Sequence, residues 1–267
     1  MGTTYEVSCL DVFAPSVRDV IQRSLPPDFN IKFANTYDAR EQLDLVTGAD
    51  FLLVGGAPLT GDMIRQAKRL RFIQKWGIGV DKIDLGAAEE AGIPLGITAG
   101  TNAGPVAELA VGLMLAVYRR IPFIDKNLRQ GKWLKSEVRS WCYQIQGKTV
   151  GLLGFGAISR MVARRLLGFD AKIIYHDLAR ADSATESALR ATYVSLDELL
   201  AQSDILSIHT PLTDGTRHLI DKNAIRKMKD NAVLINTARG GIVDEAALYD
   251  ALVSGKLLGA EIGRAHV

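Results

Sequence analysis

The chain has 267 residues, of which 48% are hydrophobic and 23% charged, and its net charge is +2. These values are typical of a soluble globular protein of about two domains, and they exclude collagen, coiled coils and disordered chains. The charges show no basic cluster that would indicate nucleic-acid binding, and the longest apolar run, Leu109 to Val117, is too short to span a bilayer. Cys9 and Cys142 cannot form a disulfide framework, which favours reduced thiols in a cytoplasmic protein.

Short apolar runs alternate with helical patterns along the first hundred residues. We expect strands at Tyr5–Leu10, Phe29–Phe33, Phe51–Val54, Arg71–Lys75 and Ile93–Thr98. Helices are expected between them at Val17–Leu25, at Ala39–Val46, from Thr60 onward and at Asp84–Ala91. Strands that alternate with helices predict βαβ units and a parallel sheet.

A second series of this kind follows the turn-rich segment Gly100–Pro105. Its first helix, Ala107–Tyr118, is apolar nearly all round, which predicts burial in a core or against another subunit. Strands are expected at Gly147–Leu153, Ala171–His176, Asp204–His209, Ala232–Asn236 and Leu257–Ile262. The helices between them are expected after Gly156, after Ser195 with a capping box to Glu198, at Asn223–Lys229, and between Asp244 and Gly255. The sequence therefore predicts two α/β domains.

The sharpest local motif is a glycine-rich turn between a strand and a helix. Gly154 allows a tight turn, and Gly156 allows the backbone to approach a pyrophosphate that faces the helix beginning at Ala157. Ser159 takes the place of the third glycine and weakens the match. Asp177 ends the next strand 23 residues after Gly154, the spacing of a ribose-binding carboxylate, which favours NAD.

Two alternatives remain open around this motif. Arg180 lies close enough to hold the 2′-phosphate of NADP, so the preference for NAD is not absolute. The glycine turn could also serve packing alone, with Asp177 merely ending a strand.

Three further loops follow predicted strands. Thr210 and Pro211 leave a strand end and could contact the cofactor, or could form an ordinary loop exit. Arg239 precedes two glycines and could hold a carboxylate, or could be a solvated arginine or part of a structural ion pair. The loop Gly77–Gly79 could bind an anion through its amides, or be a tight turn. The four histidines have no metal-site spacing, so no metal is expected.

Together these motifs resemble the D-isomer-specific 2-hydroxyacid dehydrogenases, which include phosphoglycerate dehydrogenase and the hydroxypyruvate and glyoxylate reductases. The resemblance covers nearly the whole chain, and its most specific part is Asn236 to Glu245. The other segments that carry it are Gly77–Asp81, Pro105–Leu109, Gly131–Trp133, Gly147–Gly151, the glycine-rich turn and His209–Leu212.

The resemblance implies a flavodoxin-like substrate domain, incomplete here, over residues 1–100 and an NAD-binding Rossmann domain over 101–260. It implies hydride transfer between NAD and C2 of a small 2-keto or D-2-hydroxy acid, in a homodimer formed through the NAD-binding domains, with no nucleic acid or membrane partner. Cofactor contacts are then expected at Gly154, Gly156, Ala157, Ile158, Asp177, Thr210, Pro211, Thr237, Ala238 and Arg239. Substrate contacts are expected at Gly77, Ile78, Gly79 and Arg239, and Arg239 is also expected to act in catalysis.

The last residues depart from the family pattern. Glu261 to Val267 follow Gly259-Ala260 where the family continues differently, and the family's cofactor-side Asp falls at Gly263. The resemblance implies a catalytic histidine that donates or accepts the hydroxyl proton, and the family pattern would place it beyond Val267. We expect residues 261–267 to be a non-native tail, and His266 not to be that histidine. The expected function is that of a truncated, poorly active NAD-dependent dehydrogenase. The alternative is a non-catalytic, dinucleotide-sensing protein of the same family.

Overall fold

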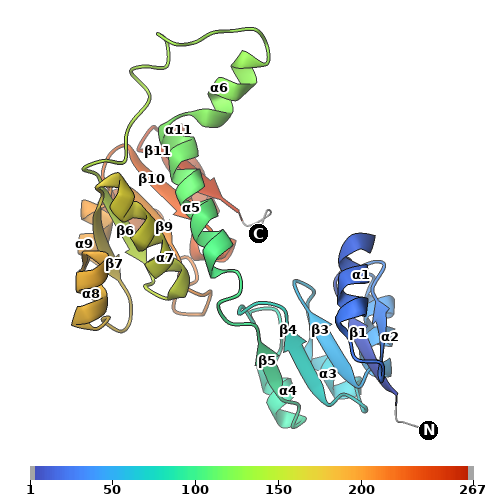
Figure 1. Ribbon diagram of the computed structural model, residues 1–267. Helices are drawn as coiled ribbons and strands as arrows, with labels where there is room; N and C mark the ends of the chain where they lie inside the picture. The colour runs from blue at the N-terminus through green and yellow to red at the C-terminus, as the bar shows by residue number, and fades with distance from the viewer. Residues whose placement is uncertain (1–3, 264–267) are drawn as a thin grey trace. The chain divides into compact units, whose positions relative to one another are not determined.

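A computed structural model describes residues 4–263 and divides the chain into two compact units, Met1–Thr101 (unit 1) and Asn102–Val267 (unit 2). The expected boundary after residue 100 lies one residue from this division. Each unit is a parallel sheet with helices on both faces (Figure 1). The predicted α/β fold class is confirmed.

Unit 1 has a five-stranded sheet in the order β2-β1-β3-β4-β5, with every pair of neighbours parallel. Its strands are β1 (Tyr5–Cys9), β2 (Phe29–Phe33), β3 (Phe51–Val54), β4 (Phe72–Lys75) and β5 (Leu95–Ile97). Its helices are α1 (Pro15–Ser24), α2 (Ala39–Gly48), α3 (Gly61–Gln66) and α4 (Leu85–Glu90). The last three helices start where a side-chain oxygen of Asp38, Thr60 or Asp84 accepts a hydrogen bond from a free backbone N–H of the first turn.

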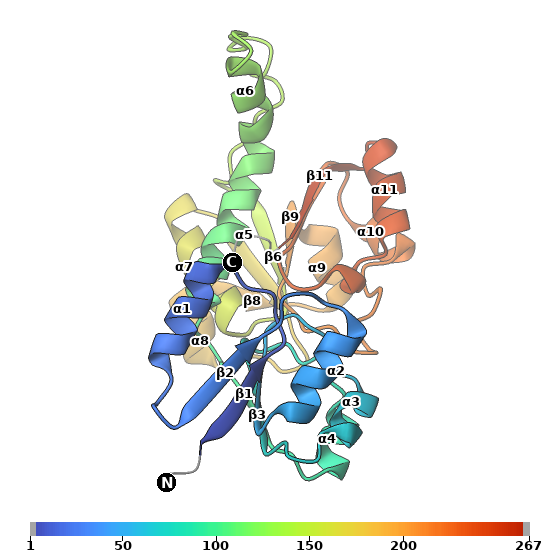
Figure 2. The same ribbon diagram turned by 90° about the vertical axis from the view of Figure 1, so that its right-hand side faces the viewer.

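The two faces of this sheet differ in how fully they are covered. Residues such as Leu52 and Ile73 are completely buried in the core with α2, α3 and α4. On the other face lies α1, which has no buried residue (Figure 2). There the rings of Tyr5, Phe29 and Phe51 contact one another at centroid distances of 5.4 to 5.6 Å but remain half-exposed. This face of unit 1 is therefore an aromatic surface with little cover.

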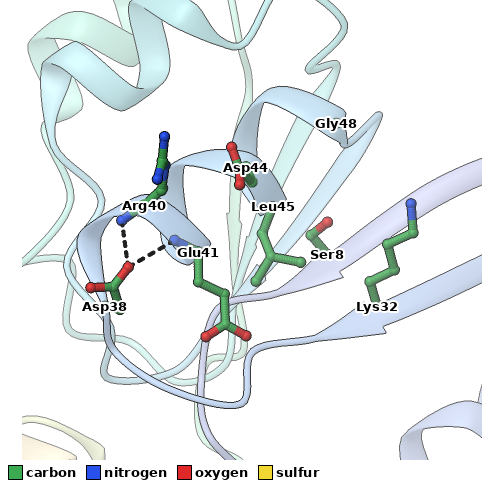
Figure 3. Close-up of a pocket in the computed structure, with 8 residues that line it drawn as sticks. All are labelled: Ser8, Lys32, Asp38, Arg40, Glu41, Asp44, Leu45 and Gly48. Carbon is green, nitrogen blue, oxygen red and sulfur yellow. Dashed lines mark hydrogen bonds between the residues drawn. The ribbon is translucent and has the colours of Figure 1, made fainter.

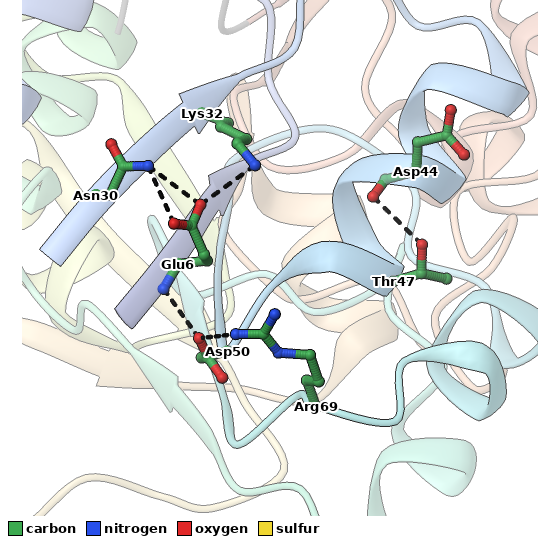
Figure 4. Close-up of polar contacts among 7 residues, drawn as sticks. All are labelled: Glu6, Asn30, Lys32, Asp44, Thr47, Asp50 and Arg69. Carbon is green, nitrogen blue, oxygen red and sulfur yellow. Dashed lines mark hydrogen bonds and ion pairs between the residues drawn. The ribbon is translucent and has the colours of Figure 1, made fainter. Parts of the chain in front are cut away.

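Charged side chains connect the strands at one edge of this sheet (Figure 4). The Glu6 carboxylate accepts from Asn30 and pairs with Lys32 on the neighbouring strand at 3.3 Å. Asp50 accepts a hydrogen bond from the Glu6 backbone N–H and pairs with Arg69, both at 2.9 Å. The hydrogen bond from Asn30 lowers the pKa of Glu6, and that from the Glu6 N–H lowers the pKa of Asp50. Both carboxylates fix the pairing of strands.

Unit 2 has a six-stranded parallel sheet in the order β11-β10-β9-β6-β7-β8. The strands are β6 (Thr149–Leu153), β7 (Lys172–His176), β8 (Ala191–Tyr193), β9 (Ile205–Ile208), β10 (Ala232–Asn236) and β11 (Leu257–Ile262). The helices are α5 (Ala103–Tyr118), α6 (Ile121–Leu128), α7 (Ala157–Leu166), α8 (Ser183–Leu189), α9 (Leu196–Gln202), α10 (Lys222–Lys227) and α11 (Glu245–Val253). Short 3-10 turns lie at Leu167–Phe169 and Gly240–Ile242. The order reverses between β6 and β9, as in a doubly wound nucleotide-binding fold.

Helix α5 begins at Ala103, four residues before the predicted start. Pro105 is tolerated in the first turn because its missing N–H would have no partner inside the helix. Val106, Ala110 and Met114 are fully or almost fully buried against α7 and the sheet. One side of this apolar helix therefore lies in the core of unit 2, and Leu113 and Leu115, which pack against that core, are only partly buried.

The sequence did not predict α6, α8 or β8. Helix α6 has no buried residue, and α8 and β8 are short. Periodicity is a weak signal in segments of this kind because few of their residues face a core. Strand β11 pairs with β10 as far as Ile262, and the Gly263 N–H donates to the Asn236 carbonyl at 3.1 Å. Residues 264–267, including His266, lie outside the described residues, so the expectation of a non-native tail remains a prediction.

Candidate functional site

The turn after β6 can be made only by glycine. Gly154 has φ +87°, and a Cβ there would lie 2.9 Å from the backbone of His209 and Thr210. Its N–H donates to the His176 carbonyl at 2.8 Å. The loops after β6, β7 and β9 therefore meet at the carboxyl ends of three adjacent strands, where ligands bind in such sheets.

Helix α7 presents a free N-terminus directly after this turn. Gly156 is its N-cap and supplies no side chain, so the first N–H groups of the helix have no side-chain cap. Nothing lies within 4 Å of the position that a Gly156 Cβ would take. The backbone N–H groups of Ala157 and Ile158 thus lie in the first turn, at the positive end of the helix dipole, without a side-chain cap. Ser159 is completely buried, so its small side chain fits the packing expected at the third glycine position.

Asp177 follows β7 and its carboxylate points to the same turn. Its Oδ2 accepts from the Phe155 N–H at 2.6 Å. The Phe155 ring is itself buried and stacks on Tyr175 with centroids 3.8 Å apart. This bond uses one oxygen of the carboxylate and holds the other at a fixed place beside the glycine turn.

The loop after β9 carries His209, Thr210 and Pro211. The imidazole Nε2 of His209 lies 2.9 Å from the Ser207 hydroxyl, and burial lowers the pKa of His209 to about 4. Thr210 is half-buried, and the Pro211 carbonyl accepts from the hydroxyl of Thr216 at 2.7 Å. His209 is therefore neutral at physiological pH and helps to hold the loop.

The loop after β10 carries the third group of expected residues. Asn236 is buried and holds both sides of this loop, because its Oδ1 accepts from the Ala238 N–H at 3.0 Å and its Nδ2 donates to the Arg239 carbonyl at 2.8 Å. Thr237 is 2% exposed, and its hydroxyl has no partner among the described residues. The half-buried Arg239 donates from its guanidinium to the Ala238 carbonyl at 2.9 Å. Asn236 was not among the expected site residues, although its place at a strand end was a usable signal.

The glycine loop of unit 1 follows β4. Gly77 has φ +117°, and its N–H and carbonyl bond to the side chain and N–H of Thr98. The N–H groups of Ile78 and Gly79 donate to no oxygen of the described residues. Lys75, at the end of β4, is buried and donates to the Gly55 carbonyl. Unit 1 thus offers two neighbouring backbone donors in a braced loop.

A hollow of about 480 Å³ on unit 1 is lined by none of the expected site residues (Figure 3). Asp38 at its rim accepts from the N–H groups of Arg40 and Glu41 and so serves as the cap of α2. The lining mixes both signs of charge, with Ser8, Lys32, Asp38, Arg40, Glu41, Asp44, Leu45 and Gly48. Its polar groups are explained by helix capping and surface charge.

Two further observations limit the kind of site. Within residues 4–263, no three His, Cys, Asp or Glu side chains gather in a way that could bind a metal ion. Over the same residues, no helix has both the length and the apolar character needed to cross a membrane.

Comparison with known proteins identifies the fold and its ligand. The family described as "D-isomer specific 2-hydroxyacid dehydrogenase, NAD binding domain" matches residues 111–262. A hydroxypyruvate reductase of Thermotoga maritima is 45% identical over 221 residues, which are 82% of this chain and 70% of that protein. This chain belongs to the D-isomer specific 2-hydroxyacid dehydrogenase family.

The chain is also similar to other members of the 2-hydroxyacid dehydrogenase family, which match different shares of its length. A D-3-phosphoglycerate dehydrogenase of Methanocaldococcus jannaschii is 37% identical over 87% of this chain and 44% of its own length. The structure of a glyoxylate reductase from Paecilomyes thermophila matches with a TM-score of 0.84 at 31% identity, over 98% of this chain and 81% of that one. The chain spans less than half of the second relative and 70% of the first. The predicted family, its NAD cofactor and its 2-hydroxyacid chemistry are confirmed.

Proposed function

We propose that unit 2 binds NAD at the carboxyl ends of β6, β7 and β9. The main support is that three features meet at this place. They are the Gly154 turn, the start of α7 without a side-chain cap, and the Asp177 carboxylate. The N–H groups at Gly156, Ala157 and Ile158 bind the pyrophosphate, and Asp177 accepts hydrogen bonds from the adenosine ribose.

The loops after β9 and β10 extend this site in the proposal. Thr210 and Pro211 line one side, and Thr237 and Ala238 line the other. The support comes from Thr237, because a buried hydroxyl without a partner costs free energy unless a ligand or water bonds to it. Asn236 holds this loop in place before the ligand arrives.

We further propose that the substrate is a small 2-keto or D-2-hydroxy acid. The Arg239 guanidinium pairs with its carboxylate and polarises the C2 carbonyl, since a planar fork matches a carboxylate. The backbone N–H groups of Ile78 and Gly79 in unit 1 can also donate hydrogen bonds to an anion. When bound, NAD supplies or accepts the hydride at C2. The proposal assigns no proton transfer to His209, because its Nε2 lies 2.9 Å from the Ser207 hydroxyl and burial lowers its pKa to about 4. We expect the 267-residue polypeptide to bind both the cofactor and the carboxylate.

Binding measurements test this function directly. NADH fluorescence should titrate with the chain, and oxalate should bind to the NADH complex as a carboxylate analogue. In Arg239→Lys, oxalate binding should weaken by about tenfold or more while NADH binding changes little, because lysine keeps the charge but loses the fork. Arg226→Lys, an exposed site on α10, is the matched control. Equal losses of NADH and oxalate in Arg239→Lys would make Arg239 a structural residue.

We propose that the chain forms a homodimer through unit 2. The support is the apolar surface of α6 and the segment after it, where Ile121, Phe123, Leu128, Trp133 and Trp141 are 42 to 73% exposed. Exposed apolar patches of this kind mark protein interfaces. Sedimentation should give twice the chain mass, and Phe123→Asp should give the single chain.

We also propose a cytoplasmic location, which the free thiols of Cys9 and Cys142 support.

A further inference from the structure

Beside the proposed ribose site lies an arginine that is already engaged. Arg180 follows Asp177 by three residues, where a guanidinium could reach the 2′-phosphate of NADP. Its Nε and one terminal nitrogen donate to the two carboxylate oxygens of Glu186 on α8, at 2.9 and 2.8 Å. Such a two-bond pair has the geometry in which an ion pair is most effective. Arg180, which follows the proposed ribose-binding Asp177, is thus paired with a second carboxylate, that of Glu186.

Glu186 is held firmly at its end of this pair. Its side chain is 13% exposed, against 65% for Arg180. It also accepts from the Tyr175 hydroxyl at 2.7 Å, and that hydroxyl accepts from the Ala181 N–H at 2.9 Å. Because Tyr175 is fully buried, its hydroxyl gives Glu186 a fixed anchor. Hydrogen bonds from Arg180 and then Tyr175 lower the pKa of Glu186, so the carboxylate is ionised at neutral pH.

A ring supports the arginine from another side. The Arg180 guanidinium lies over Tyr193 at 5.9 Å from the ring centroid. The Tyr193 hydroxyl in turn donates to the backbone carbonyl of Asp177 at 3.4 Å. Arg180 is therefore held by Glu186 and by a ring attached to the ribose-binding turn.

We propose that Glu186 is a determinant of cofactor choice, because it withholds Arg180 from a 2′-phosphate. This inference rests on the proposed NAD site. A 2′-phosphate at the ribose meets the negative Asp177, and only a nearby cation could offset that repulsion. To supply it, Arg180 would have to leave Glu186, which would keep its charge, mostly buried, with Tyr175 as its remaining donor. Asp177 repels the 2′-phosphate, and Glu186 holds the Arg180 guanidinium that could otherwise offset this repulsion.

The test uses the whole chain and two adenosine ligands, 5′-ADP and 2′,5′-ADP, with binding measured by calorimetry. Glu186→Gln keeps the size and the acceptor for Tyr175 but removes the charge. We expect the affinity for 2′,5′-ADP to rise about tenfold in this variant, while that for 5′-ADP changes less than about twofold. In the double variant Arg180→Ala/Glu186→Gln the gain should disappear. Asp197→Asn on α9, which breaks the exposed pair with Lys227 on α10, controls for the change in net charge.

A second variant tests the idea without disturbing Glu186. In the unaltered chain Arg180 is engaged, so Arg180→Ala should leave 2′,5′-ADP binding within about twofold; a loss above about fivefold would overturn the proposal. The proposal also fails if Glu186→Gln gains no more than Asp197→Asn, or if the double variant keeps the gain. Failure of 5′-ADP to bind the unaltered chain would instead remove the proposed NAD site, and this inference with it.

Discussion

Two side chains in the nucleotide region of unit 2 carry testable consequences at the scale of single residues. Asp177 is the first, because one of its oxygens is bonded to the Phe155 N–H at 2.6 Å. Asp177→Asn keeps an acceptor for that N–H and removes only the charge. The ratio of NADPH to NADH dissociation constants should fall about tenfold, since the repulsion of the 2′-phosphate is lost. Fluorescence titration of both cofactors checks this, with Asp197→Asn as the charge-matched control.

His209 is the second such residue and predicts how stability depends on pH. Its folded pKa is about 4, below the ordinary value of 6.5. Between these values the unfolded chain binds more protons at this site, so the stability that a neutral His209 allows is lost as the pH falls. The free energy of unfolding should fall by up to about 1.4 kcal/mol per pH unit from this group.

Urea unfolding at about pH 4.5, 5.5 and 7 measures this slope. His209→Gln should flatten the dependence by that amount. The exposed His218 has φ +51°, a conformation that asparagine tolerates, so His218→Asn is the matched control substitution. An unaltered slope in His209→Gln would show that other groups cause the pH dependence.

The sequence predicts single residues well where spacing along the chain determines their meeting. Gly154 and Asp177 flank one βαβ unit, and their distance in sequence brings them together in any such unit. Glu186 and Asn236 were not predicted as positioning residues. The Arg180–Glu186 pair forms only because α8 places Glu186 near Arg180. The hydrogen bonds of Asn236 form only because the following loop returns to its side chain. No periodic pattern in the sequence predicts either contact.

At the scale of elements, the turn between β6 and α7 fixes the proposed nucleotide site. In Gly154→Ala a Cβ would press on the backbone of His209 and Thr210 at 2.9 Å, and φ would remain at +87°. We expect a loss of about 1–3 kcal/mol in stability and of most NADH binding. Thermal unfolding and NADH titration measure the two effects. Gly168→Ala, in a 3-10 turn of ordinary φ with open space around the Cβ, is the control.

Strands were predicted closely where apolar residues recur regularly, either in a continuous buried run, as in β10, or in alternation with polar residues, as in β2. The bounds of β2, β3 and β10 agree with the sequence analysis to the residue, and the capping box at Ser195 starts α9 as expected. Helix α6 was missed because none of its residues is buried, so no core-facing stripe marks it. The start of α5 was placed too late because Gly104 and Pro105 were taken as breakers, although a first turn accepts both.

At the scale of the whole chain, the two units have separate cores. The buried cluster of unit 1 contains residues from Leu10 to Ile93, and the two clusters of unit 2 contain residues from Ala107 to Leu257. Among the described residues, the buried clusters of each unit contain no side chain of the other unit. All residues of the proposed NAD site also lie in unit 2.

A fragment of residues 102–267 should therefore fold alone and bind NADH within about threefold of the affinity of the whole chain, because its buried clusters contain no side chain of unit 1. Circular dichroism during thermal unfolding and NADH titration measure both properties, and the fragment with Gly154→Ala should fail to bind. The fragment of residues 1–101 should fold less well and bind an apolar dye, because the half-exposed rings of Tyr5, Phe29 and Phe51 leave one face of its sheet accessible. An unfolded 102–267 fragment would show that unit 2 needs unit 1 for stability, and that two separate cores do not make two independent folding units.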